Sequence, residues 1–371
     1  MLARKEIPFF DYPAVFLADR QEIIESIGDV LERGAYIMQS DLTDFEHELA
    51  DFLGMKHAIG VGDGTMGLLL PLLACRLEPG DEVIVPSHTF IASAAAIHHA
   101  GGIPVPVDCA QDHLIDAESV RAALTSRTRG IMPVQLNGRT ANMDPIVEIA
   151  DQHDLFIVED SCQALGSTFK NRPAGSFGIA GAISFYPSKT LACLGDGGAI
   201  VTNDDEIAGI ARTLRDHGRG EDGQVSMWGF NTRLDNLQAA VLRIKLRGYR
   251  ASIEHRRELA AIYEERLSGI EQLLLPPGPE SSVHHYDIYQ NYEIEAESRN
   301  GLRTHLGSHG VKTILQWGGM AIHQFVKLGF DVSLPYTERM VERFMLLPMN
   351  TSLNDDDIHY ICDRIADFYA V

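Results

Sequence analysis

The feature that most constrains the fold is a regular alternation of short apolar segments with helical segments between residues 57 and 160. The short apolar segments have the length and bounding turn residues of strands, and they lie at residues 57–61, 82–86, 104–108, 130–136 and 154–160. A helix is expected after each of the first four. One helix between successive strands predicts βαβ units, and therefore a mostly parallel sheet with helices on both faces. The sequence thus predicts the α/β class.

The remainder of the chain predicts two domains. The first 55 residues have helical periodicity, and a further helix is expected over residues 205–217. A long amphipathic stretch follows at about residues 234–267, and the last hundred residues mix short strands with helices. We therefore expect a large domain over residues 1–245 and a smaller α+β domain over residues 246–371.

Composition excludes several classes of function. The formal net charge of −21 disfavours nucleic-acid binding, which normally needs a basic face, although local groups can still hold a small anion. The first eight residues carry charges where a signal peptide has its apolar stretch. The longest apolar segment, residues 66–77, contains Pro71 and Arg76 and is too short to span a bilayer. We expect a cytoplasmic protein that contacts neither nucleic acid nor membrane.

The five cysteines are scattered, odd in number and without a CxxC pair. This distribution is typical of free thiols rather than of a disulfide framework or a metal centre. We therefore expect no metal site.

Three polar clusters directly follow predicted strands, at residues 62–65, 87–90 and 159–160. Because ligands bind at the carboxyl ends of parallel strands, these clusters are expected to converge. The first cluster, Gly-Asp-Gly-Thr, opens a helix, where glycines and free N–H groups suit an anion such as phosphate. It is neither the GxGxxG dinucleotide fingerprint nor a Walker loop. A tight turn without a ligand is the alternative.

A carboxylate pair and a lysine add to this pattern. Glu159 and Asp160 end an apolar strand, where a carboxylate can hold a protonated ring nitrogen or merely cap a turn. Lys189 lies in a small, glycine-rich region between apolar strands. A desolvated lysine loses its proton readily and becomes a nucleophile toward carbonyls, whereas an exposed loop lysine does not. A phosphate cradle, an acid and such a lysine are together what a pyridoxal-phosphate enzyme needs.

The lysine region resembles the sugar aminotransferase family DegT/DnrJ/EryC1/StrS. It reads Ser-Phe-Tyr-Pro-Ser-Lys at residues 184–189, Gly-Asp-Gly-Gly-Ala at residues 195–199 and Thr-Asn-Asp at residues 202–204. The likeness covers nearly the whole chain, and includes residues 79–83, 86–90, 159–163 and 229–240. The resemblance implies a fold-type I pyridoxal-phosphate-dependent transferase, with a large domain and a smaller C-terminal one.

Roles for individual residues follow from this resemblance. Lys189 would form the Schiff base with pyridoxal 5′-phosphate and move the proton, and Asp160 would pair with the ring nitrogen. Further cofactor contacts are implied to the phosphate, the ring face and the ring oxygen, by Gly64, Thr65, Ser184, Phe90 and Gln163. Asn231 would reach the phosphate of a neighbouring subunit, which implies a homodimer with shared active sites. Capping of a helix is the alternative role for Asn231.

The implied reaction moves an amino group from glutamate, through pyridoxamine 5′-phosphate, to a keto group of a nucleotide-linked sugar. A cyclitol ketone acceptor and a non-enzymatic regulator on the same fold are the alternatives. Dehydratase relatives carry histidine at the lysine position, so Lys189 argues against that branch. The chain departs from the family at residues 63–67, 135–138 and 314–319, which leaves the sugar, ring carbon, nucleotide and stereochemistry open. Candidates for substrate contact, with packing as the alternative, are Gln316, Trp317 and His323.

Overall fold

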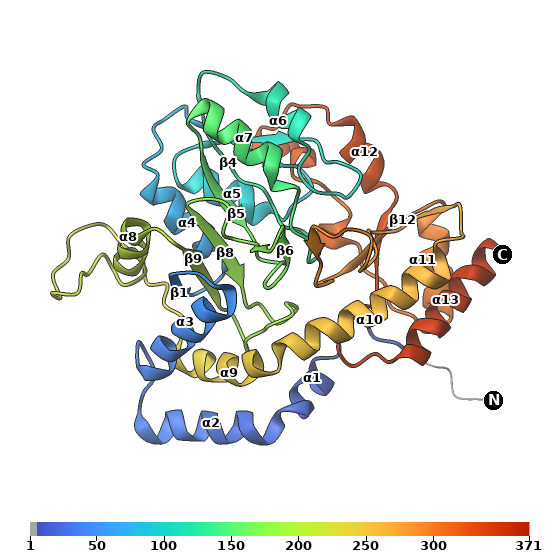
Figure 1. The fold of residues 1–371 in the computed structure, drawn as a ribbon, viewed down its shortest axis with the longest axis horizontal. Coiled ribbons are helices and arrows are strands. Elements are labelled where there is room, and N and C mark those ends of the chain that lie inside the picture. The colour runs from blue at the N-terminus through green and yellow to red at the C-terminus, as the bar shows by residue number, and fades with distance from the viewer. Residues whose placement is uncertain (1–5, 371) are drawn as a thin grey trace.

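A seven-stranded sheet forms the centre of the computed structural model, which describes residues 6–370 (Figure 1). Its strand order is β1-β9-β8-β5-β4-β2-β3. The bounds are β1 His57–Val61, β2 Glu82–Pro86, β3 Ile103–Val107, β4 Thr128–Ile131, β5 Phe156–Asp160, β8 Ala180–Ser184 and β9 Gly198–Thr202. Strand β9 is antiparallel to both neighbours, and the other neighbouring pairs are parallel. The predicted α/β fold with a mostly parallel sheet is confirmed.

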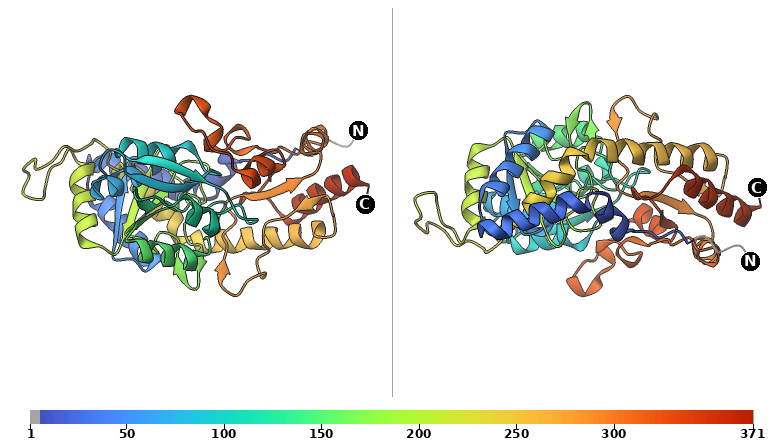
Figure 2. Two further views of the ribbon diagram at one scale, coloured as in Figure 1. Left: turned by 90° about the horizontal axis from the view of Figure 1, so that it is seen from above. Right: turned by 90° about the horizontal axis from the view of Figure 1, so that it is seen from below.

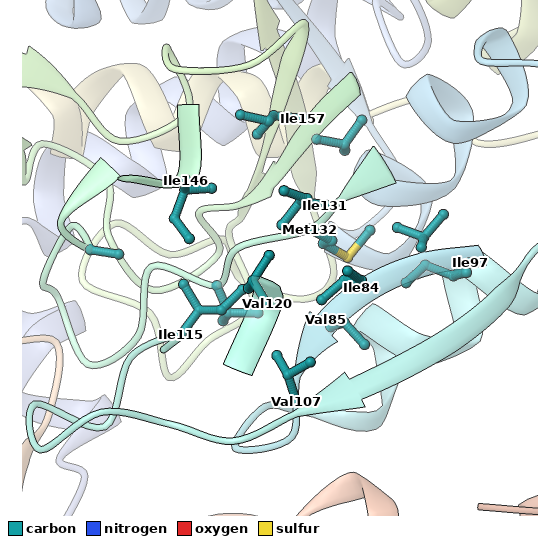
Figure 3. Packing of buried hydrophobic residues seen from close by; sticks show 14 of the residues in the cluster. Ile84, Val85, Ile97, Val107, Ile115, Val120, Ile131, Met132, Ile146 and Ile157 are labelled. Atoms are coloured by element: carbon teal, nitrogen blue, oxygen red, sulfur yellow. The ribbon is translucent and has the colours of Figure 1, made fainter. Parts of the chain in front are cut away.

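Alternate residues of these strands are buried on opposite faces of the sheet. On one face, Ala58 and Val201 belong to the cluster that includes residues of α3 (Ser40–Leu53) and α9 (Asn236–Arg247). On the other, Ile59 and Ile200 pack with α4 (Gly64–Ala74) and α8 (Asp205–Arg215). A third cluster joins β2, β4 and β5 to α5 (Ile91–His99), α6 (Ala117–Ala123) and α7 (Met143–His153) (Figure 3). Both faces are therefore covered.

The predicted strand over residues 130–136 ends early, because β4 stops at Ile131. Pro133 lacks the N–H that a ladder needs, and its carbonyl instead accepts from Asp160 N. The chain nevertheless stays beside β5, since Gln135 N donates to Asp160 O at 2.8 Å. Residues 134–137 are thereby carried along the carboxyl end of β5.

The C-terminal part contains a second, antiparallel sheet of order β10-β12-β13. Its core includes residues of α10, β12, α11, β13 and α13. The element bounds are α10 Tyr249–Leu267, β10 Leu273–Leu274, β11 His285–Tyr286, β12 Tyr292–Ala296, α11 Arg299–Ser308, η1 Gln316–Gly318, η2 Ile322–Gln324, η3 Val326–Leu328, α12 Pro335–Val341, β13 Phe344–Leu347 and α13 Asp355–Tyr369. β11 pairs instead with the small hairpin β6 (Thr168–Phe169) and β7 (Arg172–Pro173).

The long amphipathic stretch is two helices, since the structure breaks it at Gly248 between α9 and α10. Figure 2 shows α10 leaving the central sheet and running along the C-terminal part. This break lies close to the expected division between residues 245 and 246, and we keep that division as a proposal.

The N-terminal segment is helical, as predicted, with α1 (Tyr12–Ala18), α2 (Arg20–Arg33) and α3. Its first described residues lie against the C-terminal part: Ile7 forms a bridge with Val311 and is buried in the same cluster as α10 and α13. The start of the chain therefore contacts both proposed domains. Residues 1–5, which carry most of the charges that argued against a signal peptide, lie outside the described residues. Within residues 6–370, no helix combines the length and apolar character needed to cross a membrane.

Candidate active site

A cavity of about 610 Å³ lies at the carboxyl ends of the central strands, bounded on its other side by the C-terminal part. Its lining brings together most of the residues singled out from the sequence. These are Gly64, Thr65, Phe90, Asp160, Gln163, Ser184, Lys189, Gln316 and Trp317.

The start of α4 forms one end of the cavity. Asp63 caps this helix by accepting from Met66 N at 2.9 Å. A Cβ on Gly64 would lie 2.9 Å from Cys162 Sγ and 3.0 Å from Ser184 Cβ, so no larger residue fits without a shift. The first strand residue of β9, Gly198, approaches as closely, because its Cβ would lie 2.5 Å from the carbonyl carbon of Asp63. The free N–H groups of an 11-residue helix and the nearby hydroxyls fit a phosphate.

Asp160, at the end of β5, is buried at the wall of the cavity. Its Oδ2 accepts from Ser93 Oγ at 2.7 Å, and its Oδ1 accepts from Cys162 N at 3.2 Å. The Ser93 hydroxyl is itself within 2.7 Å of Thr89 Oγ1. A carboxylate held in this way presents a fixed anionic edge, which fits a protonated ring nitrogen.

Glu159, the other member of the carboxylate pair, has a structural role. Successive strand residues point to opposite faces, so Glu159 turns away from the cavity. It accepts from Gln135 Nε2 at 2.7 Å and from Gly175 N at 2.9 Å, and also from Phe177 N. Burial raises the pKa of Glu159, and these donors oppose the rise. It ties the loop before β8 to β5.

Lys189 follows β8 in a turn closed by its N–H, which donates to Tyr186 O at 2.8 Å. Protein atoms enclose its side chain except on the cavity side, and this burial lowers the pKa of the ammonium group; the nearby Cys162 and Asp160 oppose the effect. The side chain of Gln290 brackets the lysine: its Oε1 accepts from Thr190 N at 2.9 Å and its Nε2 donates to Ser188 O at 2.8 Å. A buried lysine that deprotonates easily suits attack on a carbonyl.

Trp317 has a left-handed backbone, with φ 52°, and is followed by Gly318 and Gly319 at φ 74° and 79°. Such a backbone costs a non-glycine residue on the order of 1–3 kcal/mol. The turn places the indole in the cavity lining, with its edge against the His88 ring at a centroid distance of 5.1 Å. The tryptophan therefore forms part of the wall that a ligand would meet.

Two candidates lie elsewhere. His323 does not line the cavity; its Nδ1 is 2.6 Å from Ser87 Oγ, and its ring is buried below the wall. Asn231 is exposed outside the cavity of its own chain, where it pairs with Asp216 through the backbone and accepts a hydrogen bond from Arg233.

The lining also contains aromatic and amide side chains that the sequence analysis did not single out. Phe9 and Phe10 come from the N-terminal segment, and Gln290 and Asn291 from the chain before β12. The adjacent aromatics after Pro8 were a visible signal, although the surrounding residues 7–17 are mostly apolar. No comparable pattern marks the two amides.

The fold and this arrangement of lysine, acid and anion cradle define an aminotransferase. The model of the DegT/DnrJ/EryC1/StrS aminotransferase family matches residues 18–366, and the chain belongs to this family. It is similar to the dTDP-3-amino-3,4,6-trideoxy-alpha-D-glucose transaminase of Streptomyces venezuelae, at 37% identity over 98% of this chain and 96% of the relative. The UDP-N-acetyl-3-dehydro-alpha-D-glucosamine 3-aminotransferase of Acidithiobacillus ferrooxidans is 36% identical, with 98% of each chain covered.

A solved structure agrees with these relatives. The crystal structure of S. venezuelae DesV in complex with a ketimine intermediate has a TM-score of 0.94 to this chain, with 37% identity and 99% of each chain covered. Aminotransferases of this family depend on pyridoxal phosphate. The family resemblance and the predicted fold type are thereby confirmed.

Proposed function

We propose that this aminotransferase uses pyridoxal 5′-phosphate to move an amino group from glutamate to the keto group of a nucleotide-linked sugar. The observation that carries the proposal is the cavity, in which a half-buried lysine, a held carboxylate and a helix N-terminus converge. Each of the three fits a different part of the cofactor.

The cofactor, when bound, supplies an electron sink for the carbanion formed at the carbon next to the amino group. Lys189 would hold it covalently through Nζ and, once released, would move the proton with the same nitrogen. Asp160 would keep a proton on the ring nitrogen by a charge-assisted hydrogen bond. Thr65, Ser184 and the N–H groups at the start of α4 would bind the phosphate, and Phe90 would cover the ring face.

The acceptor class rests on the relatives, which act on a dTDP-linked and a UDP-linked sugar and are nearly equally identical to this chain. The two differ in nucleotide and sugar, so they support the class and do not select one substrate. In the cavity, Gln316 and Trp317 stand on the side of the C-terminal part, where an acceptor would meet an amide and an aromatic face.

The test uses the protein loaded with pyridoxal phosphate, glutamate labelled with nitrogen-15, and a panel of nucleotide-linked keto-sugars. The expected result is an amino-sugar that carries the label, identified by mass, with no product from the Lys189→Ala variant. Loading with cofactor but no transfer to any nucleotide-linked sugar would contradict the acceptor class. A product formed only from keto-cyclitols would favour that alternative instead, and no transfer from any donor would favour a regulator.

We also propose a homodimer whose two sites are shared, with Asn231 reaching the partner's phosphate. The chain after α8 projects away from the sheet in Figure 1. Trp228 is 96% exposed and Val225 is 68% exposed in the single chain. Exposed apolar side chains beside an exposed Asn231 fit a surface that a second copy covers.

Mixing two inactive variants tests this sharing. Lys189→Ala and Asn231→Ala each disable a different residue, and a heterodimer would have one site with both residues intact. Random reassortment then restores at most about one site in four for a two-fold dimer. If Asn231→Ala is impaired on its own and activity does not recover after subunit exchange has been verified, Lys189 and Asn231 serve the site of the same chain.

A further inference from the structure

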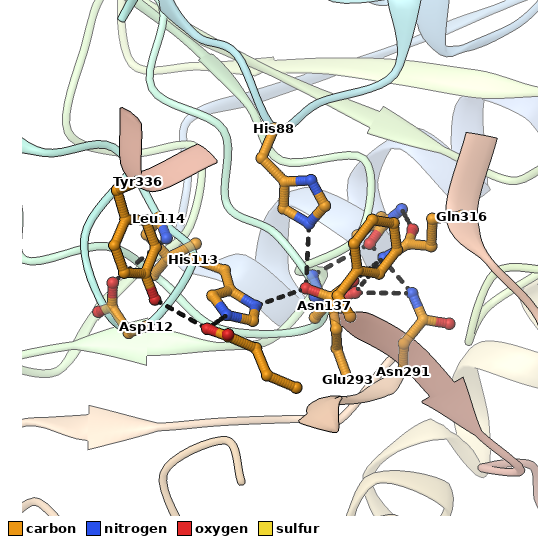
Figure 4. Close-up of polar contacts among 12 residues, drawn as sticks. His88, Asp112, His113, Leu114, Asn137, Asn291, Glu293, Gln316 and Tyr336 are labelled. Atoms are coloured by element: carbon orange, nitrogen blue, oxygen red, sulfur yellow. Dashed lines mark hydrogen bonds and ion pairs between the residues drawn. The ribbon is translucent and has the colours of Figure 1, made fainter. Parts of the chain in front are cut away.

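A buried ionic cluster lies beside Gln316 (Figure 4), and one of its members, His88, packs against the Trp317 ring. At its centre Glu293, on β12, accepts through Oε1 from His88 Nε2 at 3.0 Å and from His113 Nδ1 at 2.7 Å. His113 Nε2 is also 3.2 Å from Glu295 Oε1. The cluster joins the large sheet, through the chain after β2, to the sheet of the C-terminal part.

The cluster holds Glu293 as a carboxylate. Burial alone would raise the pKa of Glu293, but His88 and His113 outweigh it and hold the pKa well below its usual range. Burial likewise lowers the pKa of His113, and the hydrogen bonds to Glu293 and Glu295 outweigh that effect and raise it to about 9. Glu293 is therefore an acceptor only, with both oxygens available to donors.

The second oxygen of Glu293 fixes the amide of Gln316. Gln316 Nε2 donates to Glu293 Oε2 at 3.0 Å and to Asn137 Oδ1 at 2.8 Å, so both of its protons are used. Gln316 Oε1 must then face the other way, where it accepts from Gln163 Nε2 at 3.2 Å. The orientation of one amide determines the orientation of the next.

Gln163 is fixed from its other end as well. Its Oε1 accepts from Asn137 N at 3.0 Å and from Asn291 Nδ2 at 3.2 Å. A backbone N–H can only donate, so this contact leaves the Gln163 amide one orientation. Gln163 Nε2 carries two protons, and within the described part of the chain only one of them has an acceptor, Gln316 Oε1. The other is available to the cavity, which Gln163 lines.

We propose that Glu293 is a positioning residue: by accepting from Gln316 it holds Gln316 Oε1 as the acceptor of one Gln163 Nε2 proton, and this contact, added to that of Asn137 N, aims the other proton into the cavity. The donor would meet an oxygen of the bound cofactor, so this inference rests on the proposed function. Gln316 acts within the same chain, as the link between the ionic cluster and Gln163. Neither histidine touches the cavity; both act through Glu293.

A metal centre is the competing use of the cluster, since donor atoms of His88, His113 and Glu293 lie within 4.8 Å of one another. The geometry favours hydrogen bonds, because Glu293 Oε1 already lies within 3.0 Å of both ring nitrogens.

The test compares Glu293→Gln with Glu295→Gln in the full chain. A glutamine at 293 has one oxygen, which must serve either the histidines or Gln316, so the amide chain loses its anchor. Glutamine at 295 disturbs His113, Tyr336 and Arg343 but contacts no residue of the amide chain. The measurements are the dissociation constant of pyridoxal phosphate, from quenching of tryptophan fluorescence, and the position of the visible band of the loaded protein.

Glu293→Gln is expected to bind pyridoxal phosphate about tenfold more weakly, the worth of one hydrogen bond, and to shift the visible band. Glu295→Gln is expected to stay within twofold of the wild type with an unshifted band. Should Glu293→Gln fail to fold, Gln316→Met removes the link while leaving the ionic cluster intact, and the same weakening is expected.

Equal cofactor affinity and an unshifted band in the wild type, Glu293→Gln and Gln316→Met would overturn the inference while leaving the proposed function standing. A stoichiometric metal in the purified wild type, lost on His88→Ala, would also overturn it and make the cluster a metal site. A wild type that neither binds pyridoxal phosphate nor transfers an amino group would remove the proposed function itself, and with it the role of the donor.

Discussion

Replacing Ser93 with alanine isolates the contribution of a residue that touches the proposed reaction only through Asp160. Ser93 is fully buried, and its hydroxyl donates to Asp160 Oδ2 at 2.7 Å. The other donor to this carboxylate is Cys162 N, at the longer distance of 3.2 Å. The substitution therefore removes the shorter of the two contacts that stabilise the ionised form.

The expected loss follows from the charge on the acceptor. A hydrogen bond to a charged group contributes about 1.5–3 kcal/mol, roughly a factor of 10 to 150 in an equilibrium or a rate. A less stabilised carboxylate competes with the cofactor for the proton that it is proposed to leave on the ring nitrogen. The half-reaction with glutamate should slow by about this factor.

Stopped-flow absorbance of the cofactor-loaded protein with glutamate measures this half-reaction without any sugar. Ser167→Ala is the matched control: Ser167 is equally buried, but its hydroxyl bonds Thr140 Oγ1 at 2.6 Å and not Asp160. Ser167→Ala should lower the free energy of unfolding, measured in urea, about as much as Ser93→Ala. It should leave the rate of the half-reaction with glutamate within twofold of the wild type. If Ser93→Ala loses stability but transaminates at the wild-type rate, Ser93 does not act through Asp160 and the reasoning fails.

Three further outcomes are expected. Borohydride should fix the visible chromophore on Lys189, as mapped by peptide mass, and Lys189→Ala should fold, bind cofactor without the covalent link and lose transfer; label on another lysine would contradict this. Asp160→Asn should lower kcat more than loss of one oxyanion-hole donor, about 3 kcal/mol, because the charge and the electron sink weaken together; a wild-type kcat would exclude the residue. The pKa of His113 is raised from its usual 6.5 to about 9 by Glu293 and Glu295. Its ion pair therefore contributes fully to stability below about pH 6.5, and this contribution is lost as the pH rises through 9. Urea midpoints of the wild type should fall over that window, and those of His113→Gln should not.

The central sheet was predictable because its signals are local. Strands at residues 57–61 and 82–86 have the predicted bounds, since a short apolar run and the turn after it decide both ends. The segment at residues 130–136 was predicted too long, because Pro133 ends the ladder while the chain keeps its direction beside β5. Composition and periodicity cannot distinguish a paired strand from a parallel-running loop.

The lysine, the acid and the phosphate turn were predictable for a different reason. Asp160 ends β5, Gly64 and Lys189 come shortly after the ends of β1 and β8, and the carboxyl ends of parallel strands meet at one edge. The strand pattern alone did not indicate which of Glu159 and Asp160 faces the cavity, and the prediction of Asp160 came from the family resemblance. That choice depends on the phase of the pleat relative to the neighbouring strands, which a single residue of register reverses.

The amides of the wall required the docking of the C-terminal part. Gln290, Asn291 and Glu293 lie within four residues of each other, yet they contact the backbone beside Lys189, the amide of Gln163 and the amide of Gln316. These contacts of Gln290 and Asn291 span 100 to 128 residues of chain, so they are set by how the C-terminal part packs on the central sheet, and no local pattern records them. One short segment thus contacts the cavity lining at three places. A change in the packing of β12 would therefore displace both Lys189 and Gln316. The C-terminal part is therefore a structural component of the candidate active site. Substitutions in its buried core are expected to lower the rate of amino transfer as well as the stability of the fold.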